Sequence, residues 1–307
     1  MAIGHYIKEI GRGKDGARAL GRAQACDLFG QILDGQVSDL ELGAFCIAMR
    51  IKGETPEEMC GFLDATHARL KPVPVAVAAA GPATVVIPSY NGARKLPALT
   101  PLLALLLARR KLAVVVHGTA TEDQRVSTAT VLEALGIALQ GNPHGVQRGQ
   151  VAFYPTEMLH GGLHRLLEVR RTLKLRNPAH SLVKLLAPCA GPQVLVTSYT
   201  HPEYAVSMAQ VLCQMQSTAL LLRGTEGEAV ADPRRLPRMQ CIVRGSPEAT
   251  IEHQPGTLAS LPDLPGPQAL ATAAYIQDVL DARLPLPEPI ALQVEQIVRL
   301  AEVACVA

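Results

Sequence analysis

The chain has 307 residues, of which 48% are hydrophobic and 18% are charged, and its net charge is +2. These proportions allow a substantial core and exclude a wholly disordered chain. The longest apolar run, Leu99 to Leu107, is too short to cross a bilayer, and the basic N-terminus lacks the apolar segment of a secretion signal. We therefore expect a cytoplasmic protein without membrane segments.

The N-terminal part of the chain shows only helical periodicity. Apolar residues recur three and four positions apart in three segments, Gln24–Leu33, Asp39–Ile51 and Pro56–Ala68. Ser38 with Glu41 and Thr55 before Pro56 are typical helix starts. Residues 1–70 are thus predicted to form a helical domain of about four helices.

The predicted helix Asp39–Ile51 carries more apolar residues than packing on one side requires. Besides Phe45, it presents Leu40, Leu42, Ile47 and Met49 around much of its circumference. Burial against a second subunit would explain this excess, and so would burial inside the domain. The first explanation predicts a homodimer formed by residues 1–67.

After a linker at residues 72–74, short aliphatic runs alternate with helical segments. The expected strands are Thr84–Ile87, Ala113–Val116, Val194–Ser198, Ala219–Leu222 and Gln240–Val243. The expected helices are Ala98–Ala108, Thr128–Leu135, Leu159–Leu173, Glu203–Met215, Gln268–Leu280 and Ile290–Val303. This alternation predicts an α/β fold with a mostly parallel sheet over residues 71–307.

Cysteine usage fits the same compartment. The seven cysteines form no CxxC pair, so we expect reduced thiols and no zinc site.

Positive charge is concentrated in the first 244 residues. Residues 245–307 carry two arginines against eight acids, a sum of −6, so the preceding residues sum to +8. Six cations lie between residues 164 and 184 with Glu168 as the one acid, and they are Arg165, Arg170, Arg171, Lys174, Arg176 and Lys184. Such runs are often solvated helix faces, but their density here indicates an anion-binding surface.

Ligands in a parallel sheet bind in the loops that follow the strands. The loop after the first strand reads Pro88 to Lys95, where Arg94 and Lys95 stand beside Tyr90, expected to be exposed, and the turn signal Asn91-Gly92. The loop after the second strand contains His117 and Gly118. Arg94 and Lys95 are expected to contribute to nucleic-acid binding. Ordinary turns are the alternative to a possible ligand cleft formed by Tyr90, Asn91, Gly92, His117 and Gly118.

Two further patterns bear on chemistry. Arg170, Lys174 and the pair Arg176-Asn177 are spaced to share one edge of a helix and its exit, although cations are favoured at any helix C-terminus. Glu226 and Glu228 are paired carboxylates at a strand end and could hold Mg²⁺, but a plain glycine turn is the preferred interpretation. We expect no catalytic residue, no bound metal and no other cofactor.

The order of these features resembles the anthranilate phosphoribosyltransferase family, of the nucleoside phosphorylase and class III glycosyltransferase fold. A helical domain precedes a strand-loop-helix unit, His117-Gly118 follows the second strand, and a basic helix ends in LRNPAHSLVKLLAP. The resemblance covers the whole chain. It places Arg176 at the family's anthranilate-facing arginine.

The chain departs from that family where phosphate is handled. The glycine-rich GTGGD loop is replaced by Pro88 to Gly92, the NxST segment is missing, and KHGN survives only as Val116 to Thr119. The Asp-Glu pair that binds Mg²⁺ in the family falls at Glu226 and Glu228, where the acids are not adjacent. These losses predict no anthranilate phosphoribosyltransferase activity.

The YbiB-like, DNA-binding branch of the family is more similar. It shares YNGARK in the first loop, a histidine and glycine after the second strand, and the segment Leu175 to Leu186. The resemblance implies a homodimer that binds DNA, single- or double-stranded, through a basic groove. The alternative is a glycosyltransferase or phosphorylase acting on another phosphorylated substrate, and only there would Mg²⁺ be needed. A scaffold that binds a partner is a third possibility.

Overall fold

The computed structural model describes residues 3–13, 15–75, 81–139 and 145–305. The chain divides into two compact units, one formed by residues 1–71 and 156–188, the other by residues 72–155 and 189–307. Residues 156–188, expected to lie with the sheet, belong to the helical unit, which is therefore larger than the N-terminal segment.

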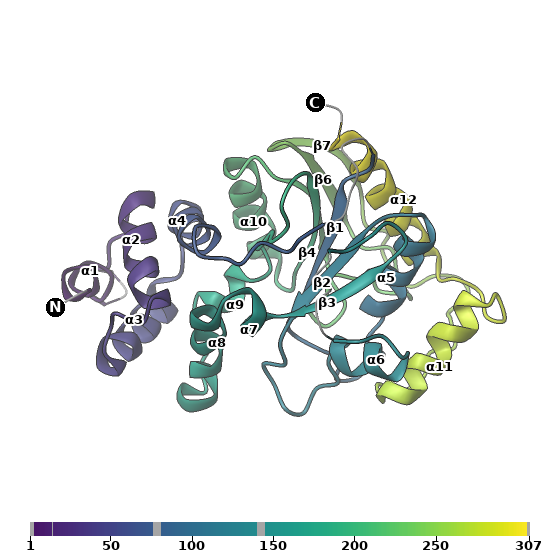
Figure 1. The fold of residues 1–307 in the computed structure, drawn as a ribbon, viewed down its shortest axis with the longest axis horizontal. Helices are drawn as coiled ribbons and strands as arrows, with labels where there is room; N and C mark the ends of the chain where they lie inside the picture. The colour runs from purple at the N-terminus through teal and green to yellow at the C-terminus, as the bar shows by residue number, and fades with distance from the viewer. Residues whose placement is uncertain (1–2, 14, 76–80, 140–144, 306–307) are drawn as a thin grey trace. The chain divides into compact units, whose positions relative to one another are not determined.

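The helical unit contains four N-terminal helices, α1 (Gly4–Ile10), α2 (Arg22–Leu33), α3 (Asp39–Lys52) and α4 (Pro56–His67) (Figure 1). It also holds α7 (Thr156–Leu159), α8 (Gly161–Leu173) and α9 (Ala179–Leu182). Its core is built on Phe29, Phe45 and Phe62, with the rings of Phe29 and Phe62 stacked at 4.7 Å between centroids. Three buried aromatic rings provide much of the apolar area that this small unit needs.

The predicted helix starts are confirmed. The Ser38 hydroxyl accepts from the Glu41 amide while the Glu41 carboxylate accepts from the Ser38 amide, which is a complete capping box. Thr55 and Glu58 form the same reciprocal pair at the start of α4, with proline at its first position. Both boxes satisfy amides that a helix N-terminus leaves without intrahelical partners.

The surface of α3 remains partly apolar in the folded chain. Leu42, Phe45 and Met49 are buried, whereas Leu40 is 84% exposed and Ile51 58% exposed. Leu40, Ile47 and Ile51 follow one another at seven and four residues, so they share one face of the helix. Burial inside the unit thus accounts for one side of α3 only.

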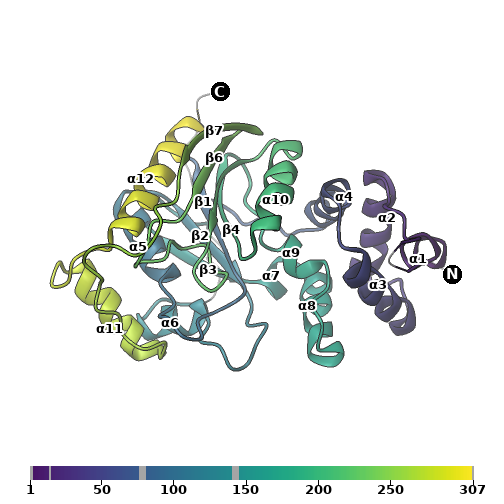
Figure 2. The ribbon, with the colours of Figure 1, turned by 180° about the vertical axis from the view of Figure 1, so that it is seen from behind.

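The second unit is built on a seven-stranded sheet in the order β3-β2-β1-β4-β5-β6-β7 (Figure 2). The strands are β1 (Thr84–Ser89), β2 (Val114–Gly118), β3 (Val151–Pro155), β4 (Gln193–Tyr199), β5 (Thr218–Arg223), β6 (Met239–Val243) and β7 (Ser246–Ile251). The first five strands in this order are parallel to one another. Strand β6 runs antiparallel to β5, and β7 runs antiparallel to β6. The expected mostly parallel α/β sheet is confirmed.

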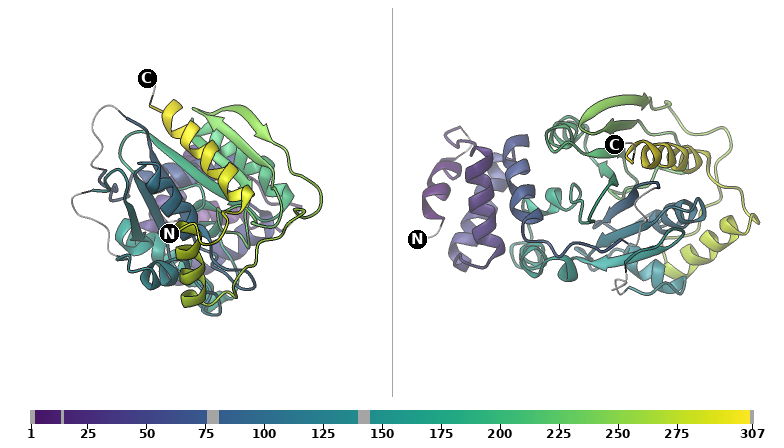
Figure 3. Two further views of the ribbon diagram at one scale, coloured as in Figure 1. Left: turned by 90° about the vertical axis from the view of Figure 1, so that its right-hand side faces the viewer. Right: turned by 45° about the horizontal axis from the view of Figure 1, so that its top comes forward.

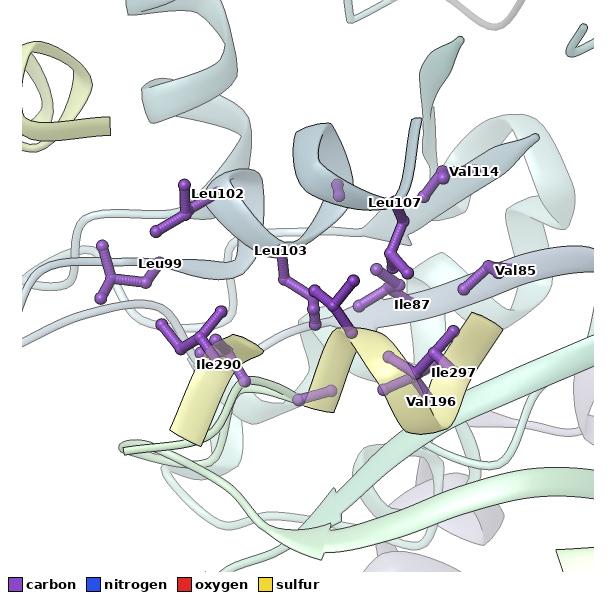
Figure 4. Packing of buried hydrophobic residues seen from close by; sticks show 14 of the residues in the cluster. Val85, Ile87, Leu99, Leu102, Leu103, Leu107, Val114, Val196, Ile290 and Ile297 are labelled. Carbon is purple, nitrogen blue, oxygen red and sulfur yellow. The ribbon is translucent and has the colours of Figure 1, made fainter. Parts of the chain in front are cut away.

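Helices cover both faces of this sheet. The elements are α5 (Thr100–Arg109), α6 (Thr128–Ala134), α10 (Pro202–Gln214), α11 (Ala269–Leu280) and α12 (Glu288–Val303). On one face, α5 and α12 pack against each other and on alternate strand residues such as Val85, Ile87 and Val196 (Figures 3 and 4). Burying one such side chain contributes about 1.5–3 kcal/mol. The helix α10 contacts β4 and β5 on the other face.

Two strands and one helix break were missed by the sequence analysis. The edge strand β7 has the polar sequence SPEATI, and the other edge strand, β3, reads VAFYP. Neither contains a run of aliphatic residues. The expected helix Leu159–Leu173 is interrupted at His160, whose extended backbone and ring Nδ1 cap α8 by accepting from the Leu163 amide. Among the described residues, no helix has the length and apolar composition needed to cross a membrane.

Candidate functional site

The candidate site lies where β1 and β2 end side by side. Ser89 pairs in register with Gly118, and Pro88 with His117, so the loops after the two strands leave the sheet together. A Cβ on Gly118 would stand 1.8 Å from the Ser89 carbonyl oxygen, so only glycine allows this approach. The expected neighbourhood of the two loops is therefore present.

Tyr90, which was expected to be exposed, is buried, and so is His117. His117 belongs to β2 and is inaccessible to solvent, and Tyr90 is 5% exposed. The Tyr90 hydroxyl lies 2.8 Å from His117 Nδ1, and the two rings meet edge to face. The hydrogen bond gives both buried polar groups a partner, so this pair stabilises the start of the loop after β1 against β2.

The loop after β1 turns its backbone amides towards a glutamate carboxylate. Glu228, 2% exposed, accepts from the amides of Asn91 and Gly92 at 2.7 and 2.8 Å. The Ser89 hydroxyl donates to the same carboxylate, and the Thr100 hydroxyl does so at 3.3 Å. Thr100 is the first residue of α5, whose N-terminal end favours negative charge. This buried charge is held by four neutral donors.

A second glutamate binds the next part of the same loop. The Glu226 carboxylate accepts from the amides of Arg94 and Lys95 at 2.6 and 3.0 Å. Its backbone carbonyl accepts from the Asn91 side-chain amide at 3.3 Å. Glu226 has φ +53°, a conformation unfavourable for residues other than glycine, so these bonds hold it in place. We call the residues 89–95 with Glu226 and Glu228 the amide cradle.

Gly227 lets the two segments approach. It has φ +90°, and a Cβ there would lie 1.6 Å from the Asn91 side-chain nitrogen. The Ser198 hydroxyl donates to the Gly227 carbonyl at 3.0 Å. Asn91 and Gly92, predicted as a simple turn in a ligand cleft, therefore pack tightly against the turn that follows β5.

The two loop cations differ from the residues around them. Arg94 and Lys95 are exposed, and their backbone amides are bound by Glu226. Across the described part of the chain, no carboxylate pairs with either side chain. The cradle thus fixes the backbone of both residues and leaves their charges towards solvent.

The cations on α8 lie on different sides of the helix. Arg170 is seven residues after the buried Leu163 and three after the buried Leu167, so it lies on the inward side of the helix. The guanidinium of Arg171 pairs with Glu168 at 2.6 Å. Arg165 is exposed and donates to the Ile32 carbonyl at the end of α2. These cations spread around the helix.

The exit from α8 separates structural residues from exposed ones. Lys174 is exposed and has φ +57° at the C-cap, while Arg176 and Lys184 are partly buried. Asn177 was expected on the basic edge but is buried, donating to the Leu166 carbonyl at 2.7 Å and accepting from the Ala179 amide. Its role is to join α8 to α9. The remaining basic residues stay predicted binding residues.

Comparison with known proteins places the chain in a family. Residues 5–69 match the helical bundle domain of the glycosyl transferase family. The chain is 40% identical to YbiB of Escherichia coli (strain K12) over 296 residues, which cover 94% of this chain and 90% of that protein. The chain belongs to the YbiB branch of the anthranilate phosphoribosyltransferase-like family. Another member, the anthranilate phosphoribosyltransferase of Moorella thermoacetica, is 28% identical over 85% of this chain and 78% of its own length.

Solved structures of the family share the fold. The anthranilate phosphoribosyltransferase of Thermus thermophilus has a TM-score of 0.72 at 22% identity, covering 97% of this chain and 88% of that one. The Saccharomyces cerevisiae enzyme, solved in complex with PRPP and Mg, has a TM-score of 0.69 at 14% identity, covering 99% and 93%. At these identities the likeness establishes the architecture.

The residues at the family's metal position do not fit a magnesium site. Mg²⁺ requires carboxylate oxygens that converge on one point and remain open to the ion. Here the Glu228 carboxylate is surrounded by donors, and the Glu226 carboxylate faces two amides of the loop. Gly227 separates the two glutamates, and their carboxylates bind different pairs of amides, so they do not converge on one point.

The sequence analysis missed the cradle as a unit. Glu226 and Glu228 were noted as a carboxylate pair, and Asn91-Gly92 as a turn, but nothing linked segments more than 130 positions apart. The sequence offered one signal. Two acids stand on either side of a glycine at a strand end, and the loop after the first strand contains no acid of its own. Only the sheet order β1-β4-β5 brings these two loops together.

Proposed function

We propose that this protein binds nucleic acid, DNA above all, through phosphate contacts and without reading base sequence. The observation that carries the proposal is a group of exposed cations that have no carboxylate partner among the described residues, namely Arg94, Lys95, Arg165 and Lys174. Such cations are available to neutralise phosphates, which supply most of the affinity in sequence-independent binding. Arg170, Arg171, Arg176 and Lys184 are proposed to assist them.

Several exposed or partly exposed arginines elsewhere in the chain differ from these four because they have an anionic partner. Arg110 pairs with Glu295 at 2.7 Å, Arg283 with Asp278 at 2.7 Å, and Arg299 with Glu248 at 3.2 Å. These cations already have an anionic partner, so a phosphate would have to displace it. The acidic C-terminal part of the chain therefore neutralises its own cations, whereas the four proposed contacts keep their charge.

The mode of binding is electrostatic. Tyr90 and Tyr154 are both 5% exposed, so neither ring can receive a stacked base. Affinity should then fall steeply as salt increases, because each neutralised phosphate releases condensed counterions. We further propose that the protein lacks anthranilate phosphoribosyltransferase activity, since the acids of the cradle bind its amides.

A homodimer joined through α3 is part of the proposal. The exposed face formed by Leu40, Ile47 and Ile51 is the apolar surface that a second copy would cover. None of the seven cysteines, all of them described, forms a disulfide, as in a reducing compartment, and we place the protein in the cytoplasm. The dimer is tested by light scattering on Leu40→Glu/Ile51→Glu, with Leu270→Glu as the control at another exposed leucine. A wild type that is monomeric at micromolar concentration would overturn it.

The test of nucleic-acid binding compares two sets of four alanine substitutions. The first removes Arg94, Lys95, Arg165 and Lys174, and the control removes the exposed, paired Arg110, Arg235, Arg238 and Arg283. Both lose four positive charges. Fluorescence anisotropy with mixed-sequence oligonucleotides across a salt series gives the slope of log K against log salt. We expect the first set to flatten it by about 0.9 per lost duplex contact, or about 0.7 on single strands.

Each other outcome has a defined meaning. Equal loss in both sets would show that net charge alone governs binding and that the placement is wrong. No binding by wild type near micromolar concentration at low salt would end the nucleic-acid proposal. Turnover of anthranilate with Mg²⁺-phosphoribosyl diphosphate would instead establish the transferase.

A further inference from the structure

Tyr204 differs from the other tyrosine and phenylalanine rings of the chain. It is 39% exposed in the first turn of α10, whereas the remaining five tyrosines and the four phenylalanines, all within the described residues, are at most 9% exposed. The exposed imidazole of His201 lies beside it, with the ring centroids 6.4 Å apart. Neither side chain has a hydrogen-bond partner within the described part of the chain. Packing inside the unit therefore does not account for these two rings, which we call the aromatic pair.

An exposed cation stands at the neighbouring strand end. Arg223 is the last residue of β5 and pairs in register with Tyr199, the last residue of β4, two positions before His201. Arg223 is exposed, and no carboxylate in the described ranges pairs with its guanidinium. Burial raises the pKa of Tyr199, and Arg238 and Arg223 oppose that rise, so both guanidinium groups lie near its ring. Arg238 already has an acid, Glu252, at 3.5 Å, whereas Arg223 remains available for another anion.

The aromatic pair lies at the same end of the sheet as two of the proposed phosphate contacts. The strands β1, β4 and β5 are parallel neighbours, so the loops that follow them leave the sheet at one edge. A Cβ on Gly227 would stand 3.1 Å from the Thr200 methyl carbon, so the loop before α10 contacts the turn after β5. That turn also carries Glu226, which binds the amides of Arg94 and Lys95. Two exposed rings and three exposed cations thus follow adjacent strands of one unit.

The charges at this edge favour a polyanion as the ligand. Glu203 is exposed next to Tyr204, where a negative charge complements the start of α10. Against this acid stand the exposed Arg94, Lys95 and Arg223, none of which pairs with a carboxylate in the described ranges. A single nucleic-acid strand offers phosphates for such cations and flat bases for exposed rings.

We propose that Tyr204, with His201 beside it, stacks against a base of single-stranded nucleic acid, while Arg223 contacts a neighbouring phosphate. The inference rests on the proposed function and adds to it a contact with bases. Every base has a flat π face, so stacking tolerates any sequence and agrees with binding that does not read bases. In a duplex these faces are covered by the adjacent base pairs, so the contact is open only to a single strand.

The experiment separates the base contact from the phosphate contacts. Fluorescence anisotropy is measured with a mixed-sequence single strand, with its duplex, and with an abasic strand of equal length that keeps the phosphates and lacks the bases. Tyr204→Ala should weaken binding to the single strand about five- to hundredfold and leave the duplex and the abasic strand unaffected. Because this variant loses no cation, its slope of log K against log salt should not change. Arg223→Ala should flatten that slope on single strands by about 0.7.

Two further variants and a cross-link serve as controls. Val206→Ala removes an apolar side chain that is 64% exposed on the same helix, and it should bind the single strand like wild type. Tyr204→Phe keeps the ring and should retain wild-type affinity, because the face of the ring makes the contact. A single strand containing 5-iodouracil should, on illumination, cross-link to Tyr204 or His201, as identified by mass spectrometry of the digested complex.

Each contrary outcome is decisive. If Tyr204→Ala and wild type bind the single strand equally well, the inference is overturned and the proposed function stands. A loss of the same size on the abasic strand would place the effect in the fold rather than in a base contact, and it would overturn the inference as well. Cross-links confined to other residues would do the same. If wild type binds none of the three ligands, the proposed function fails and the inference fails with it.

Discussion

Two glutamates are equally buried in the two units, and they are satisfied in different ways. Glu58, inaccessible in the helical unit, binds the Lys52 ammonium at 2.6 Å and the amides of Leu20 and Thr55. Glu228, 2% exposed in the sheet unit, has two amides and two hydroxyls as its hydrogen-bond partners. One buried charge is neutralised by a cation, and the other is stabilised by dipoles.

The difference concerns what each carboxylate does. An ion pair such as Glu58 with Lys52 is complete, so its role is to tie α3 and the segment before α2 to α4. A carboxylate held only by neutral donors, such as Glu228, instead fixes the loop after β1 through its backbone amides. Burial alone therefore does not show how an acid is stabilised, whereas the kind of partner does.

Breaking the ion pair should have the largest effect. Lys52→Met leaves Glu58 buried without its cation, and we expect a loss of about 3–5 kcal/mol in the free energy of unfolding. Urea denaturation measures it. Lys8→Met, at an exposed lysine, should change stability by less than about 0.5 kcal/mol. If Lys52→Met is as mild as this control, the amides of Leu20 and Thr55 suffice, and the contrast between the two glutamates disappears.

Forcing the turn away from the cradle should cost somewhat less. In Gly227→Ala the new Cβ would meet the Asn91 side chain, and the left-handed backbone adds strain, so we expect a loss of about 2–5 kcal/mol. Gly256→Ala is the matched control, with φ +85° and no atom within 4 Å of the added Cβ. It should show only the backbone strain, about 1–2 kcal/mol. Equal melting temperatures for the two variants would mean that the turn can move off the loop freely.

Removing one neutral donor should have a smaller effect than removing the cation. Ser89→Ala deletes a hydroxyl bonded to Glu228 but leaves three donors, for an expected loss of about 1–3 kcal/mol. Ser207→Ala in α10, where the hydroxyl makes a single solvent-exposed hydrogen bond to the Tyr204 carbonyl, provides the baseline. A loss as large as that of Lys52→Met would indicate that the four donors act as one cooperative network.

The smallest effect concerns a buried group with an orphaned nitrogen. Burial lowers the pKa of His67, and Nε2 of its ring has no hydrogen-bond partner among the described residues. The unfolded chain then binds the proton more readily, so stability should fall as pH drops below about 6.5 towards the lower folded pKa. In His67→Leu this part of the pH dependence should vanish. Melting temperatures between pH 7.5 and 5 measure it, and an unchanged slope would contradict the assignment.

Local features of the fold could be predicted from sequence because they depend on neighbouring residues. The capping boxes at Ser38 and Thr55 lie within four positions, and the buried parallel strands show as aliphatic runs. Exposed or interrupted elements could not be predicted in this way. The polar strand β7 pairs only because β6 lies beside it, and His160 breaks a helix through a side-chain cap that periodicity does not reveal.

The residues of the candidate site also differ in whether their roles could be predicted from local sequence. The sequence by itself determined the resemblance to the family, the positions of the two loops, and the cations Arg94 and Lys95 on one of them. Only the tertiary structure decided that Tyr90 and His117 are buried against each other and that Glu226 and Glu228 bind the amides of the first loop. The physical reason is that a carboxylate can ligate a metal or occupy an amide cradle. Which of the two it does depends on donors that the sheet brings near from distant parts of the chain.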